Sequence, residues 1–372
     1  RRSSDLGGGV MRARSVASEA ARNLATGTTR AAGLALAFAA VVGALASADG
    51  RAAVDVLRGA DEYRASGSAV QVLEATDGID GARCHALARA TGVVASGALR
   101  QGDPLTALAM PSAQVTVWEA TPGLVDLLAD VGGDVAATTG GHRAAGVWYS
   151  RDLAETLGAR PGRDTATTTG TAVTAGVYSW PDDGRARTLG YAALAPVAPM
   201  GVFDQCWVQV WPADVDTAAV VYLAMDPAKA DQATVSRLNA AYGATYDAPG
   251  LLARRPTALA PVAAAIVGLV LGYLAVRLRR LELAAALHAR VPGPHLAWQQ
   301  ALEAAAWVAA GLAIAATAVA YAARTGNPDP SDWAFLLGAR TLAAGAATTV
   351  LGTLAGVATT RERHLFRYFK NR

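Results

Sequence analysis

Lysine is nearly absent from this 372-residue chain, and cysteine, phenylalanine and histidine are scarce. Only Lys229 and Lys370 are lysines among 33 basic residues, so the positive charge is almost entirely arginine. The formal net charge is small, +3, and no stretch combines a basic stripe with interleaved aromatic residues. Because such a stripe is what holds nucleic acid, we expect no nucleic-acid partner.

The motifs that carry the commonest chemistries are missing as well. No segment reads G-x-x-x-x-G-K-[ST], so the chain has no P-loop to hold ATP phosphates. The five histidines lack zinc-site spacing, and no G-x-S-x-G nucleophile elbow occurs. Acidic pairs at Asp182-Asp183 and at Asp77 and Asp80 are better interpreted as solvated turns than as a catalytic or calcium site. We therefore predict that the chain is not an enzyme and binds no cofactor or metal itself.

Apolar runs, in contrast, are abundant, and 52% of the residues are hydrophobic. Four runs have about the 20 residues that a helix needs to cross a bilayer, and none carries a charge at its centre. The sequence therefore predicts four transmembrane helices, at residues 31–48, 257–276, 296–323 and 333–359.

The interval between the first and second runs, residues 49–256, has the composition of a soluble domain. Strand-like alternation is expected at 69–73, 114–118, 171–178, 205–211 and 219–224. Helices are expected at 81–90, 122–130, 150–157 and 227–242. The predicted fold class is a four-span α-helical membrane domain with a large mixed α/β extracytoplasmic domain inserted between spans 1 and 2.

The arginines beside the spans predict the orientation. Basic residues precede span 1, fill the loop 277–295 and occupy the tail 360–372, and all three segments share one side if there are four spans. The positive-inside rule makes that side cytoplasmic. Arg254 and Arg255, at the end of the insert, oppose this assignment but are outnumbered. We expect a multi-pass plasma-membrane protein with both termini in the cytoplasm.

Residues 1–30 form a leader to span 1. The first residues resemble a translated sequencing adapter, so we expect residues 1–10 to be an artefact and Met11 to be the start. Residues 15–29 have an amphipathic pattern and predict a helix along the inner membrane surface. The alternative is a frayed polar leader.

Cys84 and Cys206 are the only cysteines, and both fall in the insert. Because the outside of the cell is oxidising, a disulfide between them is expected, with two buried thiols as the alternative. Closing so long a loop contributes about 4–5 kcal/mol in the chain-entropy model.

Two further features lie in the spans. Glycines four residues apart, Gly268 with Gly272 and Gly352 with Gly356, allow close approach of helices. Glu303 stands near the start of span 3, where a carboxylate should face protein or the headgroup region rather than lipid.

The segment after span 2 then carries a resemblance. Residues 279–304 read RRLELAAALHARVPGPHLAWQQALEA. This order of basic residue, Glu, apolar helix, turn and a third span opening with Glu resembles the FtsX/MacB-type permeases of ABC transporters. Glu282, Gln300 and Glu303 fall at matching offsets, whereas Arg290-Val291 replaces the usual Gly-Ala pair at the turn.

Two other segments are similar to that family. The leader contains AARNL at 20–24, and residues 147–178 run from an apolar strand through a helix and an Arg-Pro-Gly-Arg-Asp turn to a second strand. The resemblance implies a permease that pairs with a second copy or a sister chain and binds a separate ATPase subunit, which holds the ATP. It also implies that the ATPase contacts the loop after span 2, through the residues Arg279, Arg280, Glu282, Leu283 and Leu287, with both leucines as apolar anchors.

Three functions remain open on these grounds. The first is a permease that transmits ATPase-driven motion to an outer domain for export or extraction of a peptide, lipid or lipoprotein. The second is an FtsX-like regulator of a cell-wall hydrolase. The third is a membrane-anchored binding module without an ATPase.

Overall fold

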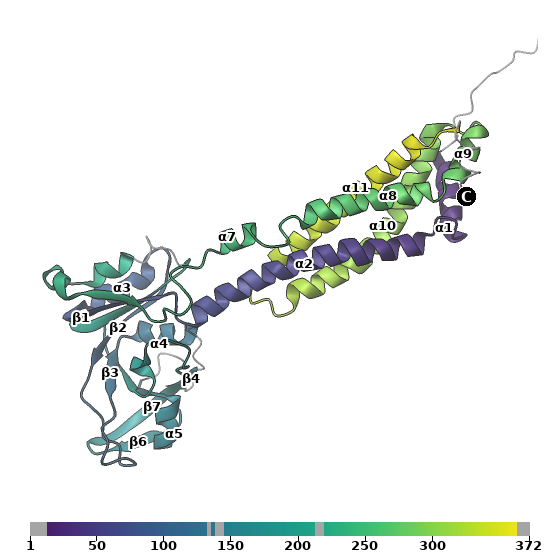
Figure 1. Cartoon of the computed structure of the whole chain (residues 1–372). Coiled ribbons are helices and arrows are strands. Elements are labelled where there is room, and N and C mark those ends of the chain that lie inside the picture. Colours follow the sequence, from purple (N-terminus) through teal and green to yellow (C-terminus); the bar gives the residue numbers. More distant parts are fainter. Residues whose placement is uncertain (1–12, 132–134, 138–144, 213–218, 363–372) are drawn as a thin grey trace, which may run out of the picture. The chain divides into compact units, whose positions relative to one another are not determined.

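The structure is a computed structural model that describes residues 13–131, 135–137, 145–212 and 219–362 (Figure 1). The predicted artefact at 1–10, the predicted start at Met11 and most of the basic tail lie outside these residues. The chain divides into two compact units. The helical unit comprises Arg1–Arg58 with Ala248–Arg372, and the sheet unit comprises Gly59–Asp247.

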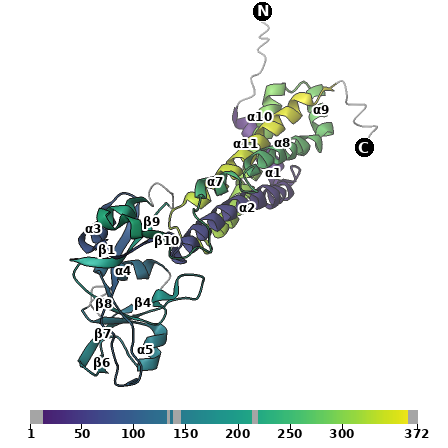
Figure 2. The same ribbon diagram turned by 60° about the vertical axis from the view of Figure 1, so that its left-hand side comes forward.

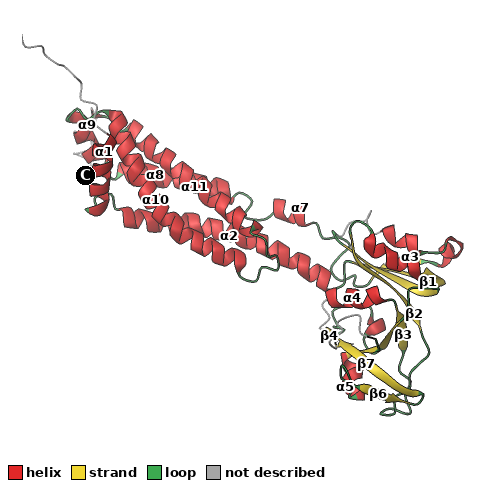
Figure 3. Cartoon of the chain, turned by 180° about the vertical axis from the view of Figure 1, so that it is seen from behind, coloured by secondary structure: helices red, strands yellow, loops and turns green. Residues whose placement is uncertain are grey.

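Among the described residues, four helices are long and apolar enough to cross a membrane. They are α2 (Ala31–Ala65), α8 (Ala260–Arg277), α10 (Gly293–Arg324) and α11 (Trp333–Thr359). Figure 3 shows how far helices dominate this unit, which also contains the shorter α1 (Ala13–Ala25), α7 (Ala248–Ala253) and α9 (Arg280–His288). The last three predicted spans agree with α8, α10 and α11 to within a few residues.

Helix α2 is longer than the predicted span, since it does not end at residue 48. No proline interrupts the following residues, and an apolar face continues through Ala53 and Val54. These two side chains are buried against Ala323 and Ala334, so packing sustains the helix after the apolar run has ended.

Glycines bring α8 and α11 into backbone contact. A Cβ atom placed on Gly272 would lie 1.9 Å from the carbonyl oxygen of Thr349, and one on Gly352 would lie 2.0 Å from that of Leu269. Neither position can carry a side chain without separating the helices. Both predicted glycine pairs are therefore used in contacts within one chain.

The described residues of the sheet unit form a ten-stranded sheet whose order is β10-β1-β9-β2-β3-β8-β5-β7-β4, with β6 paired to β7. Figure 2 shows this unit from a second direction. The strands are β1 (Val70–Asp80), β2 (Val93–Gln101), β3 (Val117–Ala120), β4 (Val135–Ala137), β5 (Val147–Ser150), β6 (Asp164–Thr167), β7 (Gly170–Tyr178), β8 (Ala193–Pro196), β9 (Val202–Val210) and β10 (Thr234–Arg237). Pairing is antiparallel except for β3 with β8 and β5 with β7.

The central strands bury both faces of the sheet. In β2, Leu99 belongs to a core that includes α4 (Pro122–Asp130), whereas its neighbour Ala98 belongs to a core that includes Cys84 of α3 (Gly81–Ala86). Successive side chains of a strand point to opposite faces, so α3 and α4 cover opposite sides. A third helix, α5 (Arg151–Leu157), packs on β5 and β7.

The predicted disulfide is present between Cys84 and Cys206, which are separated by 122 residues. It joins α3 to β9 at a position where Cys206 lies opposite Leu73 of β1 and Ala98 of β2. Both cysteines are fully buried in the α3 core, so the crosslink lies inside the packed face.

Two predictions for the sheet unit are wrong. Residues 219–224 form a 3₁₀ helix, η4 (Ala219–Ala224), instead of a strand. The segment 227–242 is not one helix, because a 3₁₀ turn, η5 (Pro227–Gln232), is followed by strand β10. Strand β10 pairs with β1, and this long-range pairing supplies backbone hydrogen bonds that the local sequence does not reveal.

Candidate functional site at one end of the helical unit

The carboxylate of Glu303 joins three segments of the helical unit. Its residue is 3% exposed and lies in the third turn of α10. It accepts a hydrogen bond of 2.7 Å from Asn23 Nδ2 of α1 and one of 3.1 Å from Gln299 Nε2 of its own helix. It also forms an ion pair with Arg279, which directly precedes α9.

Arg279 extends this junction to α9. Its guanidinium is 12% exposed and bonds both Glu303 and Glu282, the latter at 2.8 Å. A buried charge is stable only when it is paired and hydrogen-bonded, and each charge here has that partner. The ion pair and the hydrogen bonds of Glu303 therefore link the start of α9 to α1 and to α10.

Helix α1 lies against α10, with Val16 and Ala20 each 3% exposed. Asn23 continues the same face, one turn after Ala20, and reaches Glu303. The amphipathic pattern predicted the helix, but the buried partner of its apolar face is protein. A polar Asn on an apolar face was the signal in the sequence for this contact.

The predicted coupling residues occupy two kinds of position. Leu283 is 5% exposed and packs with Val276 of α8 and Leu296 of α10, and Leu287 packs against the same cluster. Leu283 is thus buried and Leu287 partly buried on the face of α9 that packs against α8 and α10, and the role of both leucines as anchors for an ATPase stays a prediction. Glu282 and Ala285 of α9 are exposed, as is Ala289, which directly follows the helix.

Arg280 is the remaining coupling residue and is the first residue of α9. It is partly exposed, as expected for the junction of a helix with an apolar unit. Among the described residues, no group of three or more His, Cys, Asp or Glu side chains could hold a metal ion.

A second buried ion pair lies elsewhere in the helical unit. Arg255 donates from Nε to Asp49 Oδ1 at 2.8 Å, and Thr341 Oγ1 of α11 donates to Asp49 Oδ2 at 3.1 Å. Asp49 is fully buried. Arg255, which opposed the predicted orientation, is thus a neutralised structural residue.

No protein-family model matches the sequence, and the curated proteins contain no match to it. Solved structures do resemble the chain. The periplasmic region of MacB from Actinobacillus actinomycetemcomitans shares 10% identity at a TM-score of 0.34, over 47% of this chain and 91% of that one.

Two more neighbours are of the same kind. A domain of a protein described as a permease, from Porphyromonas gingivalis, shares 12% identity at a TM-score of 0.32, over 47% of this chain and 92% of that one. The extracellular domain of the noncanonic ABC-type transporter YknZ from Gram-positive bacteria shares 14% identity at a TM-score of 0.31, over 45% of this chain and 100% of that one. The three descriptions name MacB, a permease and an ABC-type transporter.

Proposed function

We propose that the chain is the permease subunit of an FtsX/MacB-type ABC transporter, which transmits the motion of a separate ATPase to a domain outside the membrane. The observation that carries the proposal is the junction of Glu303 with Arg279 and Asn23. One carboxylate ties the helix between spans 2 and 3 to the leader and to span 3. An ATPase that moves α9 therefore moves the spans.

The proposed orientation places α1, α9 and both termini in the cytoplasm and the sheet unit outside. Arginine-rich connections at these three places support it through the positive-inside rule. The Cys84–Cys206 disulfide also supports it, because such bonds persist on the oxidising side of the membrane. The cargo class that fits is a peptide, lipid or lipoprotein that the outer domain meets on that side.

Exposed alanines in α9 and directly after it allow a direct test. Tagged full-length chain is purified from its own host, and an ATP-binding subunit is sought by mass spectrometry. Ala285→Asp with Ala289→Asp places two carboxylates at exposed positions without disturbing the two leucines. We expect the double variant to lose the ATPase, because docking would require burying two unpaired charges.

The matched control is Ala253→Asp on α7, at a position that is also exposed. It should retain the ATPase. Unchanged recovery in the α9 variant, or no ATPase in the unmodified complex, would refute the coupling role. Recovery of a cell-wall hydrolase in its place would favour the regulator function.

A further inference from the structure

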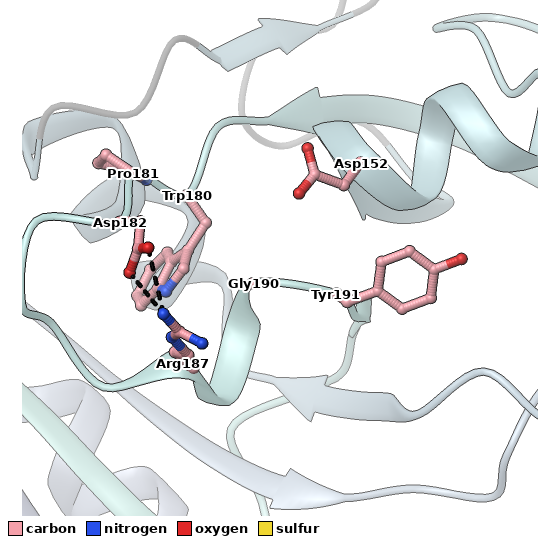
Figure 4. A pocket seen from close by; sticks show the side chains of 7 residues that line it. All are labelled: Asp152, Trp180, Pro181, Asp182, Arg187, Gly190 and Tyr191. Carbon is pink, nitrogen blue, oxygen red and sulfur yellow. Dashed lines mark hydrogen bonds and ion pairs between the residues drawn. The ribbon is translucent and has the colours of Figure 1, made fainter.

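The sheet unit contains a groove that the coupling function does not use. It has a volume of about 310 Å³, at the small end of the range for ligand pockets. Figure 4 shows the seven side chains that line it, which are Asp152, Trp180, Pro181, Asp182, Arg187, Gly190 and Tyr191. They come from the first turn of α5 and from the connection between β7 and β8.

Trp180 is held rigidly at one wall of the groove. Its Nε1 donates a 3.0 Å hydrogen bond to the carbonyl of Ala186, and its ring centroid lies 6.1 Å from that of the buried Trp207. The guanidinium carbon of Arg185 lies 5.1 Å from the Trp180 centroid. The indole plane is therefore fixed before any ligand arrives, which lowers the entropic cost of binding on it.

Asp152 and Tyr191 lie on the other side of Gly190 from Trp180, and the Tyr191 ring is directed away from Trp180 (Figure 4). Tyr191 is 48% exposed. At Gly190, an added Cβ would lie 3.3 Å from Trp180 Cδ1. A glycine at this position keeps the groove open.

The polar side chains offer both donors and acceptors. Both carboxylate oxygens of Asp182 lie 3.1 Å from Arg187 Nη2, and these side chains are 78% and 83% exposed. Within the described part of the chain, the exposed carboxylate of Asp152 accepts no hydrogen bond. Hydroxyl groups can donate to the carboxylates and accept from the guanidinium at the same time.

Charge decides the ligand class. An organic cation would suit Trp180 and the carboxylates, but Arg187 lines the groove and Arg185 lies over Trp180. An anion would be opposed by Asp152 and Asp182. A neutral ligand with an apolar face and many hydroxyl groups satisfies every lining group, and a sugar ring is such a ligand.

We propose that this groove binds a saccharide, with the sugar ring stacked on Trp180 and its hydroxyls bonded to Asp152 and to the Asp182–Arg187 pair. The site belongs to the sheet unit alone. Its occupancy does not depend on an ATPase, so this proposal and the coupling proposal can fail separately.

Binding is measured by isothermal titration on the full-length chain, purified in a detergent without a sugar headgroup. The probes are maltose, cellobiose and N,N′-diacetylchitobiose, with choline and sulfate as charged comparisons. We expect at least one disaccharide to bind and neither ion to compete. Asp152→Asn should weaken binding by about tenfold, since it removes a charge-assisted hydrogen bond.

Two variants that remove an aromatic side chain, and one that fills the groove, test the geometry of the proposed site. Trp180→Ala and Tyr191→Ala should each weaken binding by about tenfold, and Gly190→Leu should abolish it by filling the groove. Near-ultraviolet circular dichroism establishes that each variant is folded. Because Tyr191 is exposed, its variant remains informative even if Trp180→Ala does not fold.

The matched controls are Asp103→Asn and Tyr242→Ala, at exposed positions of the sheet unit away from the groove. They should bind as the unmodified protein does. The proposal is overturned if none of the three disaccharides binds, if choline binds in their place, or if the controls lose binding as much as the groove variants.

Discussion

Arg185 is a buried cation held by carbonyl groups and one carboxylate. Its side chain is 1% exposed and donates to the carbonyls of Val131 at 2.9 Å and Ala65 at 3.0 Å. Asp183 supplies the countercharge at 2.7 Å. Burial alone would raise the pKa of Asp183, but hydrogen bonds and charge from Arg185 outweigh it and leave that pKa below its ordinary value.

Asp183 should therefore stabilise the sheet unit in a pH-dependent way. Its pKa is lower in the folded than in the unfolded protein, so the stabilisation is present above the unfolded pKa of about 4 and fades as pH falls further. Asp183→Asn should lower stability at neutral pH by about 1.5–3 kcal/mol. The difference from the unmodified chain should shrink below about pH 4.

Chemical unfolding of the full-length chain, followed by tryptophan fluorescence between neutral pH and pH 3, measures this difference. Asp103→Asn serves as the exposed control and should change stability little at any pH. A deficit in Asp183→Asn that persisted unchanged at low pH would contradict the assignment.

Individual residues also mark the limit of what the sequence could predict. The position of Glu303 near the start of span 3 indicated a carboxylate facing protein or headgroups, but the sequence did not name Asn23, 280 residues away, as its partner. Asp49 and Arg255 are 206 residues apart. Counting the arginines beside the spans could therefore not reveal that Asp49 neutralises Arg255. Leu283 was identified as apolar, yet periodicity does not distinguish burial within the chain from an outward anchor.

At the scale of elements, the contact of α8 with α11 defines the helical unit. Side chains are absent where the helices meet, at Gly268, Gly272 and Gly352, so dispersion contacts form between backbones. Thr349 and Thr353 bond carbonyls of their own helix at 2.8 Å and 2.9 Å, which leaves their hydroxyls satisfied. The contact between α8 and α11 therefore needs no polar partner from another element.

Gly272→Leu should separate α8 from α11 and destabilise the protein by at least about 1–3 kcal/mol, the usual cost of overpacking. Size-exclusion chromatography in detergent and a thermal melt give the measurement. Gly33→Leu is the control, because nothing lies within 4 Å of a Cβ placed on that helical glycine. If Gly272→Leu and Gly33→Leu lower the stability equally, the close contact of α8 with α11 is ruled out.

Elements with strong local patterns were predictable, and those held by long-range pairing were not. The predicted helix 122–130 coincides with α4, and the predicted strand 171–178 lies within β7. Strand β10 depends on β1, more than 150 residues earlier in the chain, as the register of Gln71 with Arg237 illustrates. Neither the groove nor its aromatic wall was predicted, because its lining joins α5 to a loop.

At the scale of the whole molecule, the chain alternates between a helical unit and a sheet unit, and topology labelling can test the orientation proposed for them. Both native cysteines are bonded to each other, so an introduced cysteine is the unique free thiol. Asp103→Cys and Ser331→Cys should react with a membrane-impermeant maleimide on intact cells. Ala25→Cys and Ala289→Cys should react only after permeabilisation.

The two pairs of positions serve as controls for each other. Labelling of Ala289→Cys on intact cells together with protection of Asp103→Cys would invert the proposed orientation. A mixed pattern, with Ser331 protected and Asp103 labelled, would contradict four crossings.

The glycine seam has a bearing on how assembly of this protein should be studied. In the whole protein, α11 covers the surface around Gly268 and Gly272 of α8. A synthetic peptide that carries these two glycines presents this surface uncovered. In a reporter assay for helix self-association, that peptide would score as a dimer former, as small-residue helices commonly do. Such a signal would describe the interior of a single subunit, so stoichiometry has to be determined on the intact polypeptide.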